Sequence, residues 1–471
     1  MNRKSELERL DQLVRRPSGG LAVVYGRRRL GKTRLLIEWV ARHGGLYTVA
    51  DRSSARVQMQ YVAQAVSSVL PGFADVEYPD WATLLSRLAR EAKSQQFRGP
   101  IVFDELPYLA ESSPELPSVL QRWIDHDAND ASLIVAIAGS SQRMMQGLVL
   151  AESAPLFGRA SEMLQIRPLE ASYLREALGM ENPRHIIEAY AAWGGVPRYW
   201  ELADGLSGST LAHVEHLVLD PQGPLHREPD RLLLEETPTA ADTRPIFDAI
   251  GAGAHRVSEI GSRVGRPTTS MARPLGRLVE MQLIRREVPF GDSELRNKRS
   301  LYRIDDPFFR LWFRVVAPNR ARLAVSSRDM RRALLARHWE GLVSMAWEEL
   351  CRMSLPHLDS RARLGKAGRW SVGLRWWKGR NDPEWDVVAE TADRDHLLLG
   401  EVKWSSKPFS KSRIEALVAE LGSKVPPPIT AEYRVKRALF VPELASGVER
   451  EWNGVVVVTG DDVLGSARPA K

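Results

Sequence analysis

Short apolar runs alternate with helical patterns over the first third of the chain. Residues 21–25, 101–103 and 133–138 are almost entirely apolar, and residues 32–42 have the spacing of a helix. Strands of a parallel sheet give continuous apolar runs, because helices cover both faces of such a sheet. The pattern therefore predicts an α/β core with a buried parallel sheet in residues 1–168.

Between residues 169 and 240 the pattern becomes helical and polar, which predicts a helical lid. Residues 241–325 change character again. Three helices and then two strands are expected there, at residues 246–251, 257–264, 268–282, 283–288 and 300–304. Thr268 is the expected N-cap of the third helix, and Pro274 lies early in that helix, where proline is tolerated best. Three helices followed by a β-hairpin is the order of a winged-helix domain.

The last unit is expected to span residues 326–471. A helix is predicted at residues 331–350, and strands at residues 385–390, 396–402 and 455–459. Helices and short apolar strands again indicate an α/β domain.

The composition is that of a soluble globular protein, with 44% hydrophobic and 27% charged residues among 471. The single cysteine, Cys351, excludes an intramolecular disulfide and a cysteine-based zinc site. The amino-terminal residues lack an apolar signal core, and no run of about 18 apolar residues is present. We expect a cytoplasmic protein with no membrane partner.

A glycine-rich segment follows the first apolar run and opens the first helix. It reads Gly26-Arg27-Arg28-Arg29-Leu30-Gly31-Lys32-Thr33 and is followed by Arg34. This spacing is that of a phosphate-binding loop, whose backbone N–H groups surround phosphate oxygens at a helix N-terminus. We expect these nine residues to bind ATP, with Lys32 on the β- and γ-phosphates and the Thr33 hydroxyl on Mg²⁺.

Acidic and polar residues follow the other two apolar runs. Asp104 is expected to hold Mg²⁺, and Glu105 to polarise the attacking water as a general base. Ser140 or Ser141 could sense the γ-phosphate, or could equally be a helix N-cap. Arg159 could neutralise transition-state charge as an arginine finger, or could be an ordinary surface arginine.

The chain resembles the archaeal-type ATPases of the STAND branch of AAA+ proteins. The resemblance rests on Arg3-Lys-Ser-Glu6-Leu7, on the phosphate-binding loop, and on Gly195-Val196-Pro197. It implies that Arg3, Glu6 and Pro197 lie near the sugar and base of the nucleotide. It also implies a C-terminal domain similar to PD-(D/E)XK nucleases.

A cluster of acidic residues in the last unit fits that implication. Asp386 begins one expected strand, and Glu401 and Lys403 lie two residues apart on the next, so that both face one side. Asp386 and Glu401 could hold a divalent metal that activates water, while Lys403 stabilises developing negative charge. Glu348 matches the remaining acid of the nuclease pattern, and helix phase must decide between it and Glu349. The alternative is a salt bridge between exposed strands.

The expected winged helix is rich in basic residues. Residues 256–299 contain ten basic and five acidic residues. Arg273 and Arg277 lie one turn apart on the third helix, which would enter the major groove of DNA, and Arg296, Lys298 and Arg299 lie in the hairpin tip, which would contact phosphates. A net charge of +7 and a pI of about 9.5 weakly favour such a partner. The alternative is a winged helix used for packing.

These expectations combine into one hypothesis. The chain would be a slow, Mg²⁺-dependent switch ATPase that acts on DNA and cleaves it with a second metal site, and it could form a homo-oligomer on binding ATP. The alternatives are an ATP-dependent DNA-binding regulator with an inactive nuclease fold, and a protein–protein signalling scaffold.

Overall fold

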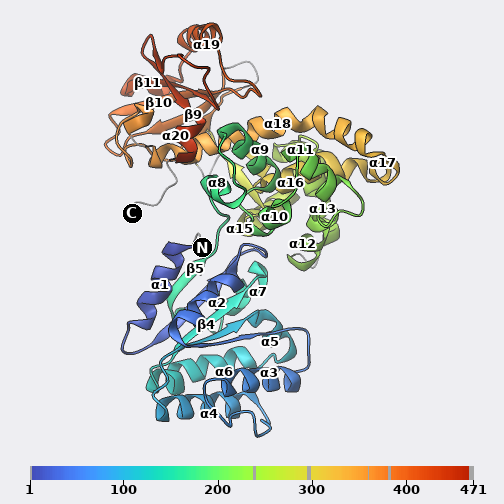
Figure 1. Ribbon diagram of the computed structural model, residues 1–471, viewed down its shortest axis with the longest axis vertical. Helices are drawn as coiled ribbons and strands as arrows, with labels where there is room; N and C mark the ends of the chain where they lie inside the picture. The colour runs from blue at the N-terminus through green and yellow to red at the C-terminus, as the bar shows by residue number, and fades with distance from the viewer. Residues whose placement is uncertain (1–2, 237–239, 294–298, 359, 380–382, 466–471) are drawn as a thin grey trace. The chain divides into compact units, whose positions relative to one another are not determined.

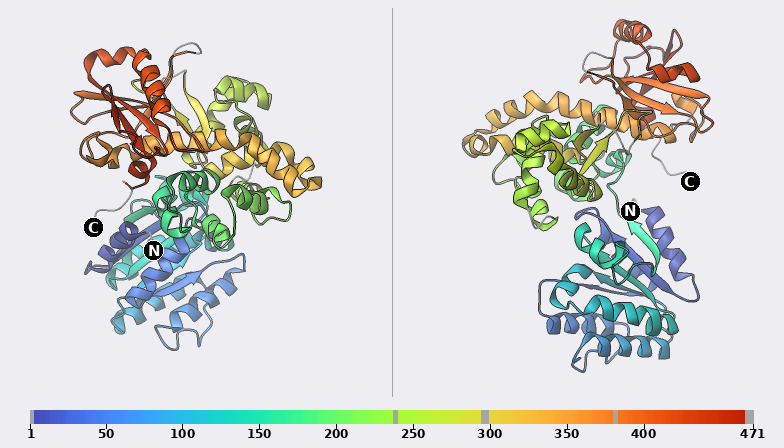
Figure 2. Two further views of the ribbon diagram at one scale, coloured as in Figure 1. Left: turned by 45° about the horizontal axis from the view of Figure 1, so that its top comes forward. Right: turned by 180° about the vertical axis from the view of Figure 1, so that it is seen from behind.

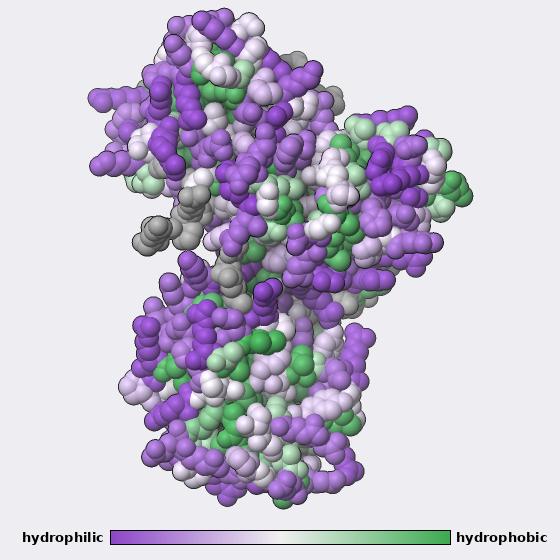
Figure 3. Space-filling model, in the orientation of Figure 1, coloured by the Kyte–Doolittle hydropathy of each residue, from purple (hydrophilic) through white to green (hydrophobic). Residues whose placement is uncertain are grey.

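The computed structural model describes residues 3–236, 240–293, 299–358, 360–379 and 383–465 (Figure 1). The chain forms two compact units, of which the first extends to Pro168 and the second contains most of the remaining residues. Hydrophilic side chains cover most of the face seen in the space-filling view, with smaller hydrophobic patches among them (Figure 3). No helix in the described ranges is long and apolar enough to span a membrane.

A five-stranded parallel sheet forms the centre of the first unit, which confirms the expected α/β core. Its order is β2-β3-β4-β1-β5. The strands are β1 (Gly20–Tyr25), β2 (Leu46–Val49), β3 (Pro100–Asp104), β4 (Ile134–Gly139) and β5 (Ala160–Gln165). The apolar runs correspond to β1, β3 and β4. The edge strands β2 and β5 bury only part of their residues, so they lack a continuous apolar run.

The helices of the first unit are α1 (Lys4–Val14), α2 (Lys32–His43), α3 (Ala55–Ser67), α4 (Trp81–Ser94), α5 (Leu106–Ser112), α6 (Leu116–Trp123) and α7 (Gln142–Met145). Helix α4 shows how the sequence specifies them. The Asp80 side chain accepts a hydrogen bond from the N–H of Thr83 at 2.8 Å and so caps the helix. Its apolar residues recur every three or four positions, which places Trp81, Leu84 and Leu88 in one buried stripe.

The second unit begins with short helices and continues with the segment expected to be a winged helix. The helices are α8 (Leu174–Ala177), α9 (Pro183–Trp193), α10 (Pro197–Ala203), α11 (Thr210–Val214), α12 (Glu228–Glu236), α13 (Ala240–Gly251), α14 (Val257–Val264) and α15 (Thr268–Glu280). Strands β6 (Ile284–Glu287) and β7 (Leu301–Ile304) then pair as an antiparallel hairpin. The order of elements is the expected one, although Pro267, and not Thr268, is the N-cap of α15. The winged-helix assignment itself stays a prediction.

A mixed six-stranded sheet forms the C-terminal part of the second unit. Its order is β12-β13-β11-β10-β9-β8. The strands are β8 (Leu374–Trp376), β9 (Trp385–Glu390), β10 (His396–Val402), β11 (Arg434–Val441), β12 (Glu451–Trp452) and β13 (Val455–Thr459). The remaining helices of the second unit are α16 (Pro307–Leu311), α17 (Arg320–Val325), α18 (Arg328–Ser354), α19 (Lys411–Ser423) and α20 (Gly460–Gly465). Helix α18 runs from the helical part of this unit to the sheet (Figure 2).

The hairpin between β6 and β7 packs against the C-terminal sheet. Phe290 is 8% exposed and belongs to the same hydrophobic cluster as Trp385. Its N–H donates to the carbonyl of Arg375 at 2.8 Å, and the Trp377 indole donates to the carbonyl of Arg299 at 3.2 Å. The described part of the hairpin tip is therefore anchored in this unit, whereas the sequence suggested a tip held out toward DNA.

A buried carboxylate joins the hairpin to helix α18. Glu349 is 8% exposed. Its oxygens accept hydrogen bonds from Arg285 on β6, at 2.6 Å, and from Arg310 on α16. Burial acts to raise the pKa of Glu349, but Arg285 and Arg310 outweigh it and hold that pKa below its ordinary value. Glu349 is therefore ionised and fixes three elements together.

Replacing Glu349 by Gln should lower the free energy of unfolding by about 3 kcal/mol, because Arg310 would lose its charged partner inside the protein. Urea unfolding followed by circular dichroism measures the loss. Glu340→Gln, an exposed position on the same helix, is the matched control and should change stability little. Equal stability of the two variants would contradict a structural role for this ion pair.

Candidate nucleotide site and acidic site

The phosphate-binding loop joins β1 to α2 and depends on its glycines. Gly26 has a φ of 143°, and a Cβ there would lie 2.4 Å from the carbonyl oxygen of Ile166. Gly31 has a φ of 90°, and Arg29 adopts a φ of 68° between them. Side chains rarely tolerate this backbone, so glycine is required where the loop approaches the end of β5.

Lys32 lies inside this loop. It is 4% exposed, and its Nζ donates to the carbonyls of Gly26 at 2.7 Å and of Arg27 at 2.9 Å. A triphosphate would offer this ammonium group stronger acceptors at the N-terminus of α2. The loop residues, Lys32 and the helix N-terminus thus fit a bound nucleotide.

Thr33 and Asp104, the two residues expected to hold Mg²⁺, also lie together. Thr33 Oγ1 donates to Asp104 Oδ2 at 2.9 Å, and the backbone N–H of Glu105 donates to Asp104 Oδ1 at 2.8 Å. The Tyr47 hydroxyl donates to Asp104 Oδ2 at 2.6 Å. Thr33 and Asp104 are oxygen donors of the kind Mg²⁺ prefers, so they fit the expected ion.

Tyr47 was not recognised from the sequence. It lies on the edge strand β2, whose register places it beside Val102 of β3. Burial and the neighbouring Asp104 carboxylate hold the pKa of Tyr47 far above its ordinary value, so the hydroxyl remains a donor. Tyr47 therefore orients the carboxylate that would hold Mg²⁺.

Glu105 contacts Ser140 across the sheet. Strand β4 lies between β1 and β3, so the residue after β4 lies next to the residue after β3. Ser140 donates to Glu105 through its Oγ at 2.5 Å and through its N–H at 3.3 Å. Both carboxylate oxygens of Glu105 thus bind Ser140, which makes Ser140 a partner of the expected general base.

Arg3 braces the phosphate-binding loop from α1. Its guanidinium donates to the carbonyls of Leu30 at 2.9 Å and of Arg167 at 2.7 Å, and it pairs with Glu6 at 2.9 Å. Arg3 and Glu6 are thereby placed next to the loop. Pro197 begins α10 in the second unit. Its proximity to the nucleotide stays a prediction, as does that of Glu6.

Arg159 and Arg28 each have partners close to them in the first unit. Arg159 forms a two-pronged ion pair with Asp125, at 2.8 and 2.9 Å, and also donates to the carbonyls of Pro155 and Phe157. This arrangement gives Arg159 a structural role, and a role as an arginine finger stays a prediction. In the loop, Arg28 donates to the Tyr108 hydroxyl.

The acidic residues of the C-terminal sheet gather as the sequence suggested. Strands β9 and β10 are antiparallel, with Val387 opposite Gly400, so Asp386 lies across from Glu401. Asp386 Oδ2 accepts a hydrogen bond from the N–H of Val402 at 3.0 Å. Burial, followed by the charges of Glu348 and Glu401, raises the pKa of Asp386 to about 7.

Helix phase decides which residue of α18 joins this cluster. Glu348 faces Asp386 closely enough to raise its pKa, whereas Glu349 is turned to Arg285 and Arg310. Consecutive residues on a helix point about 100° apart, so these two carboxylates face different neighbours. Glu348 is therefore the candidate, and Glu349 belongs to the core.

Cations surround the cluster. Lys403 binds Glu401 at 2.8 Å, and Lys424 binds the other oxygen of Glu401 at 2.5 Å. Arg352 pairs with Glu348 at 3.5 Å and donates to the carbonyl of Asp386 at 3.1 Å. Lys424 and Arg352 were not recognised from the sequence. Lys424 lies 23 residues after Glu401, whereas Arg352 lies one helical turn after Glu348, a spacing that could have indicated it.

The carboxylates of Glu348, Asp386 and Glu401 are not arranged as a complete metal-binding site. Within the ranges that the structure describes, no three His, Cys, Asp or Glu side chains are grouped closely enough to hold a metal ion. Oxygen donors suit a divalent cation, but such an ion would have to displace the proton of Asp386, and Glu401 already binds two lysines. A metal would fit only if one lysine released Glu401.

The basic residues expected to contact DNA fall into three groups. Arg273 and Arg277 are exposed on α15. Arg299 pairs with Asp292 at 2.5 Å and donates to the carbonyl of Trp377. Arg296 and Lys298 lie outside the described residues. The pair on α15 therefore remains the best placed for a phosphate backbone.

Comparisons with known proteins match two parts of the chain. Residues 1–203 match a family of ATPase domains found predominantly in Archaea, and residues 312–416 match a family of archaeal and bacterial proteins of unknown function. An uncharacterised protein of Methanocaldococcus jannaschii is 26% identical over 418 residues, which is 86% of this chain and 87% of that protein. Residues 1–203 are thus similar to ATPase domains, and residues 312–416 are similar to the second family.

Two solved structures are loosely similar. A Walker-type ATPase of Pyrococcus abyssi has 18% identity and a TM-score of 0.48, over 66% of this chain and 95% of that one. The ORC2 protein of Aeropyrum pernix, in ADPNP and ADP complexes, has 14% identity and a TM-score of 0.44, over 72% of this chain and 94% of that one.

The raised pKa of Asp386 predicts how stability depends on pH. Unfolded Asp ionises near pH ~3.9, whereas the folded protein keeps this proton to about pH 7. The folded state then binds more protons, so the free energy of unfolding falls as pH rises between these values. Asp386→Asn should remove this loss, raising the melting temperature by on the order of a few degrees at pH 8 and not near pH 4.

Thermal unfolding in EDTA at pH 4, 6 and 8 would measure this dependence. Glu415→Gln, at an exposed position on α19, serves as the control. A gain from Asp386→Asn that is the same at every pH would contradict the assigned pKa.

Proposed function

We propose that the first unit binds ATP with Mg²⁺ and hydrolyses it slowly. The observation that carries this proposal is the meeting of Thr33, Asp104 and Glu105 at the carboxyl ends of β1 and β3, next to a loop that encloses Lys32. The match to an ATPase domain family over residues 1–203 supports it.

Each residue has a distinct part in this function. Lys32 and the loop N–H groups bind the β- and γ-phosphates, while Thr33 and Asp104 hold Mg²⁺. Glu105 orients and deprotonates the attacking water. Because both of its oxygens bind Ser140, Glu105 must turn away from Ser140 first. That requirement favours a slow switch over a rapid motor.

Two variants separate binding from hydrolysis. Lys32→Ala should weaken ATP binding at least about tenfold, because it removes the charge that faces the phosphates. Glu105→Gln should keep ATP affinity and lower the hydrolysis rate by about 100-fold or more. Calorimetric titration and phosphate release in Mg²⁺ measure the two effects.

Lys93→Ala, an exposed lysine of α4 in the same unit, is the control for charge removal. Full ATP affinity in Lys32→Ala, or an unaltered protein that binds no nucleotide, would refute the proposal.

A second candidate function is metal-dependent cleavage of DNA by the C-terminal sheet. The favouring observation is that Asp386 lies across from Glu401, which Lys403 binds, and that the charges of Glu348 and Glu401 both act on Asp386. A divalent ion on Asp386 and Glu401 would activate water, and Lys403 would stabilise the phosphoryl charge. The exposed Arg273 and Arg277 would hold the DNA backbone.

The two lysines on Glu401 give this candidate a sharp test. In Mg²⁺ or Mn²⁺, Lys403→Ala should abolish cleavage of plasmid DNA without weakening DNA binding. Lys424→Ala should keep or increase cleavage, because it frees one oxygen of Glu401 for the metal. Agarose gels and fluorescence anisotropy measure cleavage and binding, with and without ATP.

The binding face has its own variant. Arg273→Ala with Arg277→Ala should weaken duplex binding and flatten its salt dependence. If the unaltered chain binds DNA and no metal supports cleavage, the C-terminal sheet is an inactive fold in a DNA-binding regulator. If the chain binds no DNA at all, the remaining alternative is that it is a protein–protein signalling scaffold.

A further inference from the structure

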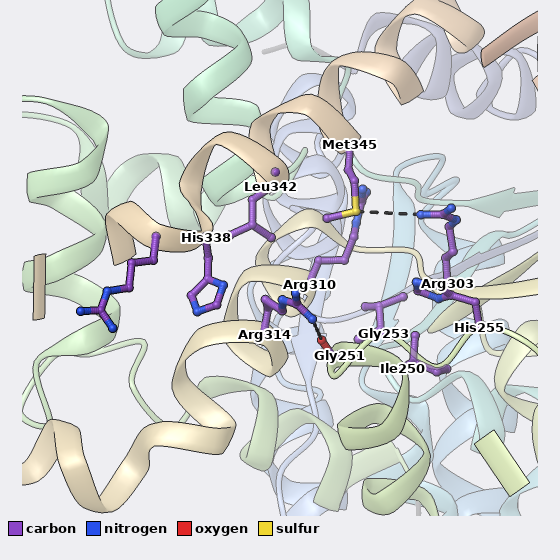
Figure 4. A pocket seen from close by; sticks show the side chains of 13 residues that line it. Ile250, Gly251, Gly253, His255, Arg303, Arg310, Arg314, His338, Leu342 and Met345 are labelled. Atoms are coloured by element: carbon purple, nitrogen blue, oxygen red, sulfur yellow. Dashed lines mark hydrogen bonds between the residues drawn. The ribbon is translucent and has the colours of Figure 1, made fainter. Parts of the chain in front are cut away.

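A hollow in the second unit lies apart from both sites described above. Its volume is about 350 Å³, within the range of about 300–1,000 Å³ typical of ligand pockets. The walls come from the end of α13, from β7 and from the middle of α18. His338, Leu342 and Met345 reach into it from α18, and Arg314 and Arg303 face them (Figure 4).

Positive charge dominates this hollow. Four arginines and two histidines line it, and no Asp or Glu is among the described residues of its wall: Arg303, Arg310, Arg314, Arg337, His255 and His338. Arg303 and Arg310 are neutralised from behind the wall by Glu287 and Glu349. Arg314 donates to the carbonyl of Gly251 at 3.2 Å. Neither Arg314 nor Arg337 pairs with a carboxylate in the part of the chain that the structure describes.

The positive charges of the wall also help to lower the pKa values of His338 and His255. Burial, and then the charges of Arg314 and Arg337, lower the pKa of His338. Burial and Arg303 lower the pKa of His255. An anion in the hollow would relieve this repulsion, because it attracts the cations that oppose each other.

The rest of the wall is apolar. Ile250, Ile304, Leu342 and Met345 contribute hydrocarbon and thioether surface. A ligand that fills the space must therefore combine an anionic group with an apolar body. Inorganic ions alone would leave this surface uncovered.

A glycine of α18, Gly341, forms part of the wall of the hollow. Gly341 lies inside a 27-residue helix, where alanine would be more stable. A methyl group at this position would meet no atom within 4 Å, so packing does not require glycine. Larger side chains would project from this wall of the hollow. A second hollow of about 550 Å³ shares Gly251, Arg314 and His338 with the first, and its wall adds Arg244 and Asp248, which pair with each other at 3.2 Å.

We propose that this hollow binds a small organic phosphate, with the phosphate between the Arg314 and Arg337 side chains and the organic part against Ile304, Leu342 and Met345. Guanidinium groups bind phosphate oxygens through pairs of parallel N–H donors. The concave shape suits a small molecule, whereas the backbone of duplex DNA requires an open surface.

Phenyl phosphate is a suitable probe, since it joins a dianion to an apolar ring. Calorimetric titration of the full chain should show saturable binding, and benzyl alcohol should not bind. Arg314→Ala with Arg337→Ala should weaken binding at least tenfold. Gly341→Leu should abolish it by filling the space, while Gly341→Ala should retain it and raise the melting temperature.

The variant Lys32→Ala in the phosphate-binding loop distinguishes this site from the nucleotide site. It should bind phenyl phosphate as the unaltered protein does. Binding that Lys32→Ala removes, or that a folded Gly341→Leu variant keeps, would overturn the proposal. So would the absence of saturable binding at millimolar probe. If the arginine variant loses duplex DNA binding and phenyl phosphate never binds, the wall is a DNA contact, which also overturns it.

Discussion

The buried ion pairs of Glu349 fix the rotation of helix α18 about its own axis. Arg285 and Arg310 hold this carboxylate from two different elements, so the helix cannot turn without leaving charges unpaired in the interior. Every other residue of α18 then has a set direction. Glu348 faces Asp386, while Gly341 and Met345, eight and four residues before Glu349, lie on the same stripe of the helix. One interaction thus places both the acidic cluster and the cationic hollow.

The first unit depends on strand order in a comparable way. Because β4 separates β1 from β3, its last residues lie between the phosphate-binding loop and the acids that follow β3. Ser140 consequently reaches Glu105, and Thr33 reaches Asp104. The parallel direction of the strands brings these carboxyl ends to one edge of the sheet. Residues 71 and 35 positions apart in the chain therefore meet without a long loop.

Local pattern was enough to find much of this arrangement. The phosphate-binding loop has a fixed spacing, and β9, β10 and β13 begin and end where their apolar runs do. Other features depend on contacts that local pattern does not contain. Tyr47 is an example, because it lies on the partly exposed edge strand β2, which has no continuous apolar run.

Of the lysines that bind Glu401, Lys403 was predicted from its spacing, whereas Lys424 was missed. Lys424 follows a helix that returns to the sheet from the far end of β10. The position of the hairpin tip could not be foreseen either, because the segment is polar around Phe290 and its partner Trp385 lies about a hundred residues later.

The buried position of Phe290 limits where the second unit can be divided. The aromatic ring fills part of the hydrophobic interior beneath the C-terminal sheet, and the backbone beside it hydrogen-bonds to Arg375. A polypeptide beginning at residue 326 would lack this ring, and one ending at residue 325 would expose it to water. A division between residues 325 and 326 would therefore separate Phe290 from the hydrophobic cluster to which it belongs.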